Sequence, residues 1–422
     1  ADNSNNINTT DKEQTFITGE DPNNYIWYSG KLWRAISIDP ADNSVKLVTQ
    51  WNVSAVPYNE EENTDYEKSY MREWLNDTTV DGFLGNLRDP EKFIKMDSVW
   101  NASETTETTK PPEATMVTDP IGLLNIYEYT MSYNNVEVSN GYLNNELSWW
   151  LLTPYDNENI SLVYNDGANS YNAVVHAFGV RPALNLKSDV GVMEGNGTID
   201  DPYRLYGDND KDLSGTLLST RYSGEYIRFG IGENNLYRIV SHETTGLTKI
   251  TSAEPLKQSG NFITSAFGDN VIFSSSNTIG TFLNENYLNT NSGYLSSNDI
   301  SMIEGNTFWY LGTVGRGMSY IFAKYTDTNM TNTTTSTEAN VGILRLGELM
   351  AGQFDIYQNN LYYWLLTPYS SSNVLYIGNN GYADLNGYLR EDGVKPSLNL
   401  KSDIIITTGT GTKDDPFELA LS

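Results

Sequence analysis

The sequence predicts an α+β fold made of two homologous domains in tandem. The second half of the chain repeats the first, and within each half strand patterns precede and follow helix patterns without alternating strictly with them. Strict alternation is typical of parallel α/β sheets, so its absence favours, in each domain, a mixed and mainly antiparallel sheet with one or two helices. The chain of 422 residues also exceeds the common domain size of about 100–200 residues.

The repeat is strongest near the end of each half. Trp150–Tyr155 (WLLTPY) recurs as Trp364–Tyr369, and Gly179–Asp189 (GVRPALNLKSD) recurs as Gly393–Asp403 (GVKPSLNLKSD). Both pairs lie at one offset of 214 residues (364 − 150 and 393 − 179), so the alignment needs no gap between them. Chance does not produce agreement of this length, and the two halves are therefore homologous.

The repeat also sets the expected domain boundaries. Upstream, the similarity is looser and its offset drifts, which indicates loop insertions between shared elements. We expect a polar N-terminal arm over residues 1–22, domain 1 over 23–206, an acidic linker over 207–222 and domain 2 over 223–422.

Each domain begins with short strands and a helix. The strands in domain 1 are expected over residues 25–28, 32–38 and 44–50, since apolar and polar side chains alternate in the last two. The Pro, Asp and Asn residues of Asp39–Asn43 favour a turn between them. A helix is expected over residues 69–76, with its counterpart in domain 2 over 278–288.

Each domain ends with a long polar loop followed by the repeated motifs. Loops rich in Thr, Asn and Glu are expected over residues 101–114 and 326–339. Residues 121–124 predict a strand that runs into a short helix, and the WLLTP strand, a polar stretch and a closing strand follow. Pro182 and Pro396 predict that the closing strand starts there or lies at a sheet edge, because proline donates no ladder hydrogen bond.

The charge and composition exclude several classes of function. The chain has 54 acidic and 26 basic residues, for a net charge of −28, which disfavours nucleic acid and anionic membranes as partners. It has no cysteine, hence no disulfide and no thiol nucleophile. No apolar stretch is long enough to predict membrane insertion. A polar surface carried by Asn, Thr and Ser is typical of secreted and cell-surface proteins.

The closing motifs resemble a known family. Trp149–Pro154 (WWLLTP), an Asn/Gly-rich stretch and Gly179–Leu186 (GVRPALNL) resemble the DUF6273 family of uncharacterised domains, common in exported and surface proteins of Gram-positive and gut bacteria. More distantly, the pattern resembles the C-type-lectin-like fold, which implies that the polar stretch between these strands displays a binding surface. Lys395 replaces Arg181 in the second copy, so we expect a structural role there, since ammonium does not reproduce bidentate guanidinium contacts.

No catalytic site is expected. The only histidines, His176 and His242, fall at non-equivalent positions of the repeats and cannot form a shared mechanism or a His-rich zinc site. The repeated pairs Asp200-Asp201 and Asp414-Asp415 predict turns before proline, because neighbours on a strand point to opposite faces. The sequence has no glycine-rich phosphate loop and no nucleophile elbow.

Calcium is the one cofactor for which the sequence offers ligands. Asp208, Asp210 and Asp212 stand at alternate positions, and calcium prefers hard oxygen ligands at such spacing. Leu213 stands where an EF-hand loop has glycine, and the segment has no copy after the second repeat. A solvated acidic linker is therefore the alternative interpretation.

The polar stretch after the WLLTP motif is the candidate ligand-binding surface. Tyrosine stacks on sugar faces or apolar patches, and asparagine exchanges hydrogen bonds with hydroxyls. The alternative is that Asn and Gly make turns while Tyr lies half-buried on strands. The candidates are Tyr164, Asn169, Tyr171 and Asn172 in domain 1, and Tyr376, Tyr382, Asn386 and Tyr388 in domain 2.

Two functions are favoured at this point, and a third, an enzyme with a carboxylate site, stays open without a substrate that the sequence names. The first is a non-catalytic extracellular or cell-surface protein of a Gram-positive-type bacterium, whose two lectin-like domains serve adhesion or bind a glycan or protein. The second is a structural subunit of a surface filament, pilus or layer that binds copies of itself. In that case an arm segment such as Thr15–Thr18 would complete a sheet of its neighbour.

Overall fold

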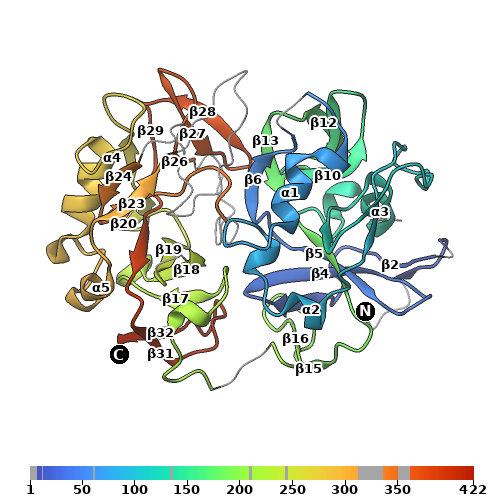
Figure 1. Cartoon of the computed structure of the whole chain (residues 1–422), viewed down its shortest axis with the longest axis horizontal. Coiled ribbons are helices and arrows are strands. Elements are labelled where there is room, and N and C mark those ends of the chain that lie inside the picture. The colour runs from blue at the N-terminus through green and yellow to red at the C-terminus, as the bar shows by residue number, and fades with distance from the viewer. Residues whose placement is uncertain are drawn as a thin grey trace. The chain divides into compact units, whose positions relative to one another are not determined.

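The structure is a computed structural model that describes residues 7–11, 13–59, 62–133, 136–208, 212–242, 246–311, 336–349 and 362–422. It divides into two compact units whose boundary in the sequence lies near residue 209. We call them domain 1 and domain 2 and describe each by itself. Each consists mainly of strands with a few short helices, in agreement with the predicted α+β class (Figure 1).

Domain 1 contains two sheets. The first comprises, in spatial order, β15 (Val192–Glu194), β16 (Tyr203–Leu205), β3 (Tyr25–Tyr28), β4 (Lys31–Ile38), β5 (Val45–Thr49), β14 (Ala183–Leu186) and β9 (Ile121–Gly122). The second comprises β12 (Asn169–Ala173), β11 (Asn159–Val163), β10 (Trp149–Pro154), β13 (Ala177–Val180) and β6 (Ser54–Pro57). Only the pairs β16–β3 and β10–β13 of these two sheets are parallel, so the sheets are mixed and mainly antiparallel.

Domain 2 repeats this topology. Its first sheet comprises β17 (Tyr226–Arg228), β18 (Leu236–His242), β19 (Thr248–Ser252), β30 (Ser397–Leu400) and β25 (Val341–Gly342). Its second comprises β22 (Thr264–Ala266), β29 (Glu391–Gly393), β26 (Tyr363–Pro368), β27 (Asn373–Ile377) and β28 (Ala383–Gly387). Even the parallel pair recurs in register, since Trp149 faces Gly179 in domain 1 and Tyr363 faces Gly393 in domain 2.

The sequence predicts one sheet per domain, and the structure corrects this to two. β13 ends at Val180 and β14 begins at Ala183, so Arg181 and Pro182 carry the chain from the second sheet into the first. The closing strand therefore starts directly after the proline, as predicted. The alternative of an edge strand is wrong, because β14 lies between β5 and β9.

The helices are short, and one of them is tied to a sheet in both domains. α1 (Tyr70–Asn76) begins after Ser69, whose side chain accepts a hydrogen bond from the backbone of Arg72. Its counterpart is α4 (Thr278–Thr281), which continues as the π-helix η7 (Phe282–Tyr287). Asn76 accepts a hydrogen bond from Ile121 N (3.0 Å) and donates one to Ile121 O (3.1 Å), and an equivalent asparagine on η7 binds β25 in the same way.

The remaining elements are short helices, 3-10 turns and two-stranded ribbons. The other α-helices are α2 (Pro90–Phe93), α3 (Ile126–Ser132) and α5 (Ser297–Met302). The 3-10 turns are η2 (Tyr66–Lys68), η3 (Leu84–Asn86), η4 (Val138–Asn140), η5 (Leu218–Thr220), η6 (Gly232–Asn234) and η8 (Thr290–Ser292). The two-stranded ribbons are β7 (Val99–Asn101) with β8 (Met116–Thr118), β23 (Thr307–Tyr310) with β24 (Ser336–Ala339), β20 (Lys257–Gln258) with β21 (Asn261–Phe262), and β31 (Ile404–Thr408) with β32 (Glu418–Leu421). Most of the loop predicted over residues 326–339 lies outside the described residues.

The N-terminal arm folds onto domain 1. Its strand β1 (Ile7–Asn8) pairs with β2 (Thr15–Ile17), and β2 pairs with the end of β4 through Thr15–Ile38 and Phe16–Ser37. The Phe16 side chain is fully buried, and its ring meets that of Tyr127 edge-on at 6.2 Å. The segment that the filament hypothesis requires as a donor strand is therefore already paired within its own domain.

Candidate functional site

The most strongly repeated residues form a buried framework. In domain 1, Thr153 Oγ1 accepts a hydrogen bond from Ile126 N at 2.9 Å, which fixes the start of α3. Trp150 Nε1 donates to Val56 O at 3.0 Å, which ties β10 to β6 across the sheet. Both bonds recur in domain 2, at 2.9 and 2.8 Å. The WLLTP motif is thus explained by its role in folding, and a ligand site must be sought elsewhere.

Arg181 belongs to this framework. Its side chain is fully buried, its Nε donates to Thr49 O at 2.8 Å, and its Nη1 donates to Leu143 O at 2.6 Å. The guanidinium lies 4.5 Å from the Trp149 ring centroid, and burial lowers the pKa of Arg181 to about 9. Lys395 is equally buried and also lies over an aromatic ring. An aromatic face accepts either cation, and this shared contact is consistent with the substitution between the copies.

A buried ion pair also recurs in both domains. Lys46 Nζ lies 2.5 Å from Glu128 Oε1, and Lys249 Nζ lies 2.8 Å from Glu348 Oε1. Glu128 Oε2 additionally accepts a hydrogen bond from Asn125 N at 3.0 Å, as part of the capping box of α3. Because each carboxylate is paired and hydrogen-bonded within the domain, these pairs serve structure.

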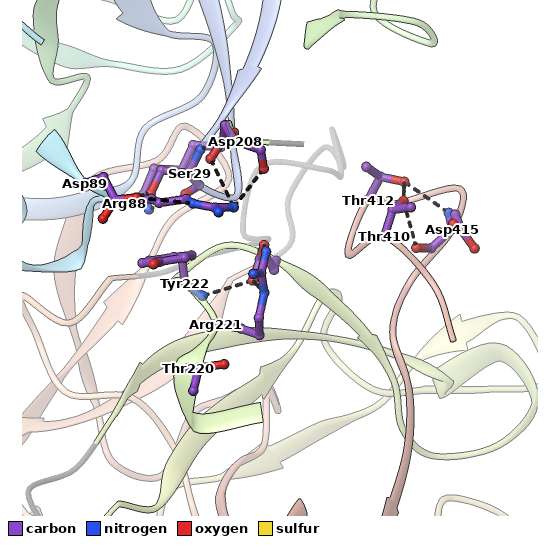
Figure 2. Close-up of polar contacts among 12 residues, drawn as sticks. Ser29, Arg88, Asp89, Asp208, Thr220, Arg221, Tyr222, Thr410, Thr412 and Asp415 are labelled. Atoms are coloured by element: carbon purple, nitrogen blue, oxygen red, sulfur yellow. Dashed lines mark hydrogen bonds and ion pairs between the residues drawn. The ribbon is translucent and has the colours of Figure 1, made fainter. Parts of the chain in front are cut away.

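The histidines and the paired aspartates have local partners. His176 Nδ1 is 2.5 Å from Asn172 Oδ1, and His242 Nδ1 is 3.1 Å from Thr248 Oγ1. Asp415 occupies a turn in which Thr410 N donates to its carbonyl at 3.0 Å (Figure 2). A bond of the same length closes the turn at Asp201 in domain 1. The expected turns before proline are therefore present.

The candidate calcium ligands are only partly described. Asp208 is buried, and its Oδ2 accepts a hydrogen bond from Ser29 N at 3.1 Å (Figure 2). Arg88 Nη1 lies 3.9 Å from Asp208 Oδ1 and donates to the Asp208 carbonyl at 2.9 Å. Asp212 is exposed, and Asp210 lies outside the described residues. Within the described ranges, no three His, Asp or Glu side chains group as metal ligands.

The polar stretch of domain 1 forms the hairpin β11–β12, and β12 is the edge strand of the second sheet. Of the predicted binding residues there, Tyr171 is exposed, whereas Tyr164, Asn169 and Asn172 are half-buried. The Tyr171 ring stacks on that of Tyr155, with 3.7 Å between centroids and 8° between planes. Residue exposures of 45% for Tyr171 and 51% for Tyr155 make this pair an aromatic surface open to solvent.

Tyr155 was not among the residues predicted from sequence. It ends the repeated WLLTPY motif. An aromatic residue directly after an apolar strand pattern is the sequence signal from which it could have been predicted. The turn that follows is well defined, because Asp156 Oδ1 accepts hydrogen bonds from Glu158 N and Asn159 N, each at 2.8 Å. The turn therefore holds Tyr155 in place beside β12.

The hairpin β27–β28 of domain 2 differs in what it exposes. At the offset of 214 residues, Tyr369 and Leu385 correspond to Tyr155 and Tyr171; Leu385 is exposed and Tyr369 is half-buried. The four residues predicted in this hairpin are all half-buried. The Tyr376 ring meets a neighbouring ring edge-on at 5.1 Å, and Asn386 Nδ2 donates a hydrogen bond to Asp392 at 2.9 Å. Tyr388 packs against the core, and Tyr382 lies just before β28. We use the term hairpin patch for Tyr155 with Tyr171 in domain 1 and Tyr369 with Leu385 in domain 2.

Comparison with known proteins gives one match. A family model described as a domain of unknown function (DUF6273) matches residues 42–188 and 269–402, one region in each domain and together more than half of the chain. No curated protein and no solved structure matches the chain. In the described part of the chain, no helix is both long enough and apolar enough to cross a membrane.

Proposed function

We propose that this chain, which belongs to the DUF6273 family and carries its domain twice, is a non-catalytic protein that binds a glycan or protein surface through the hairpin patch of each domain. The stacked pair Tyr155–Tyr171 carries the proposal. Exposed tyrosines supply large contact area with a polar tip, and they are enriched among residues that dominate binding energy. We also propose that each domain has the C-type-lectin-like fold that its sequence pattern resembles.

The geometry of the pair favours binding in a preorganised state. Each ring covers one face of the other, and the two residues remain 51% and 45% exposed, which leaves surface for a ligand. Ordering a side chain on binding costs about 0.5–1.5 kcal/mol, and the mutual stacking of Tyr155 and Tyr171 reduces this cost before the ligand arrives.

The comparison of the two domains supports separate ligands. Buried framework contacts recur almost unchanged, whereas the exposed position held by Tyr171 in domain 1 is held by Leu385 in domain 2. A common frame that presents different exposed side chains is the arrangement of binding modules whose specificity lies in loops and edges.

We place this binding outside the cell or at its surface, in a Gram-positive-type bacterium. The support is the polar surface rich in Asn, Thr and Ser and the resemblance of the motifs to those of exported proteins. A filament subunit is not part of the proposal, because the arm strand β2 pairs with β4 of its own domain.

The test is a glycan array probed with the labelled full chain and with a variant that carries Tyr155→Ser and Tyr171→Ser. We expect the variant to lose binding by at least about tenfold, since two exposed anchors worth about 1 kcal/mol or more each are removed. Tyr206→Ser is the matched control, because Tyr206 is 60% exposed and lies outside the hairpins. Unchanged binding by the double variant would disprove the role of the domain 1 patch.

A further inference from the structure

We infer that domain 1 has a second binding site, a polar groove between the N-terminal arm and the β7–β8 ribbon, which takes a neutral saccharide. Two cavities of about 190 and 180 Å³ adjoin there and share Gln14, Lys46 and Val99 in their walls. Together they reach the lower end of the about 300–1,000 Å³ that ligand pockets occupy. Among the described residues that line this arm groove, none comes from the β11–β12 hairpin, so the inference does not depend on the hairpin patch.

The two walls of the arm groove are fastened to each other. Lys110, in the loop between β7 and β8, lies 3.1 Å from Asp11 Oδ1 and 2.7 Å from Glu13 Oε2 of the arm. The Tyr127 hydroxyl donates to Asp11 Oδ2 at 3.1 Å. Burial raises the pKa of Asp11, but the hydrogen bond from Glu13 N at 2.8 Å, followed by Lys110 and Tyr127, lowers it, and the pKa lies below its ordinary value. With Phe16 buried beside Tyr127, the arm is a fixed wall.

The lysines that line the arm groove are each paired with a carboxylate. Lys46 pairs with Glu128 at 2.5 Å, Lys95 pairs with Asp42 at 2.7 Å, and Lys110 pairs with the arm carboxylates. Each lysine of the lining thus already has a carboxylate partner. An anionic ligand would find no open positive group there and would approach the carboxylates of Asp39 and Glu113, which also line the walls.

The uncharged polar side chains of the lining suit sugar hydroxyls. Hydroxyl and amide side chains offer both donors and acceptors, and they comprise Gln14, Ser37, Ser44, Ser98, Asn101 and Asn185. Val99, which is 52% exposed, and Met116, which is also exposed, add apolar surface for the C–H face of a sugar ring. This combination of a few apolar contacts with many uncharged polar groups defines the ligand class as a neutral saccharide.

Among its described residues, domain 2 has no counterpart of the arm that forms the outer wall of this site. It repeats the Lys–Glu pair and the tryptophan beside it, as Lys249, Glu348 and Trp309. Phe308 is 54% exposed at the position on β23 that corresponds to Val99 on β7. The arm, however, is present once in the sequence and folds onto domain 1. We therefore assign the site to domain 1 alone, and Phe308 supplies a matched control.

The test titrates the full chain with maltose, cellobiose and lactose and follows ligand protons by saturation-transfer NMR. We expect saturable binding of at least one of them. Val99→Lys, which projects an ammonium into both cavities, should weaken it by about tenfold or more, whereas Phe308→Lys should not. Gln14→Leu, which removes one amide without adding charge, should weaken it several-fold.

Thermal unfolding of each variant shows whether the fold is kept, and Tyr155→Ser with Tyr171→Ser should leave disaccharide binding unchanged. That result distinguishes binding in the arm groove from binding at the hairpin patch, so that one proposal can be disproved while the other stands. The inference is overturned if none of the three disaccharides binds saturably in the millimolar range, or if Val99→Lys and Phe308→Lys bind them equally well.

Discussion

Replacing Glu128 by Gln tests whether the repeated ion pair stabilises domain 1. The substitution keeps the shape of the side chain and an oxygen that accepts the hydrogen bond from Asn125 N, so the capping box of α3 can survive. It removes the negative charge that faces Lys46, whose side chain is 9% exposed. The ammonium of Lys46 would then be buried without its counterion.

The expected cost follows from this burial. Removing one partner of a buried ion pair destabilises a protein by about 3–5 kcal/mol. The Lys46 Nζ also lies 4.9 Å from the Trp100 ring centroid, and that cation–π contact is kept in the variant. We therefore expect the lower end of the range, about 3 kcal/mol, for Glu128→Gln. Lys46→Met with Glu128→Leu should cost less than Glu128→Gln alone, because no charge is left unpaired.

Hydrogen exchange of the full chain measures this effect for each domain separately, which a single unfolding curve of a two-domain protein does not. A loss of about 3 kcal/mol corresponds to exchange about a hundredfold faster in peptides from β5 and β14. Peptides from β19 and β30 serve as the internal reference, and Glu348→Gln should reverse the pattern. The reasoning is refuted if Glu128→Gln speeds exchange in domain 1 by less than about tenfold, or equally in both domains.

Three further predictions concern stability. Burial raises the pKa of Glu348, but the charges of Arg345 and Lys249 outweigh this effect, and the pKa is lowered overall. The stabilisation that ionised Glu348 contributes is therefore present above the ordinary carboxyl pKa of 4.5 and is lost as the pH falls through the lowered value. This pH dependence of hydrogen exchange should be absent in Glu348→Gln. Gly122→Ala should lower the free energy of unfolding of domain 1 by about 1–3 kcal/mol, measured by hydrogen exchange, because an added Cβ overlaps the Trp100 ring. Phe16→Ala should cost about 3–5 kcal/mol and make the arm sensitive to limited proteolysis, since a fully buried ring is lost.

The sequence predicted individual elements better than their assembly. The helix expected over residues 69–76 is observed as α1 at Tyr70–Asn76, because its cap and its apolar face are local signals. The turn at Asp39–Asn43 is present, and Asn43 adopts a positive φ of 59° that asparagine tolerates. The division into two sheets was missed, since GVRPALNL reads as one strand and only Pro182 marks the change of sheet.

The candidate site was predicted in part, for a similar reason. Exposure of Tyr171 follows from its place on an edge hairpin, which local patterning indicates. Tyr388, directly after β28, is half-buried against the core because of the direction in which the chain leaves the strand, and sequence spacing does not determine that. The arm groove was not foreseen at all, because the polar composition of residues 1–22 conceals the burial of Phe16 against another part of the chain.

The most direct test of the central claim, that the edge hairpin presents the binding surface, is a comparison of two dissociation constants. The glycan that gives the strongest array signal would be immobilised and titrated with Tyr155→Ser/Tyr171→Ser and with Tyr206→Ser, with the fold of both verified by circular dichroism. We predict a dissociation constant higher by about tenfold or more for the hairpin variant and an unchanged one for the control. Equal dissociation constants for the two variants would contradict the claim.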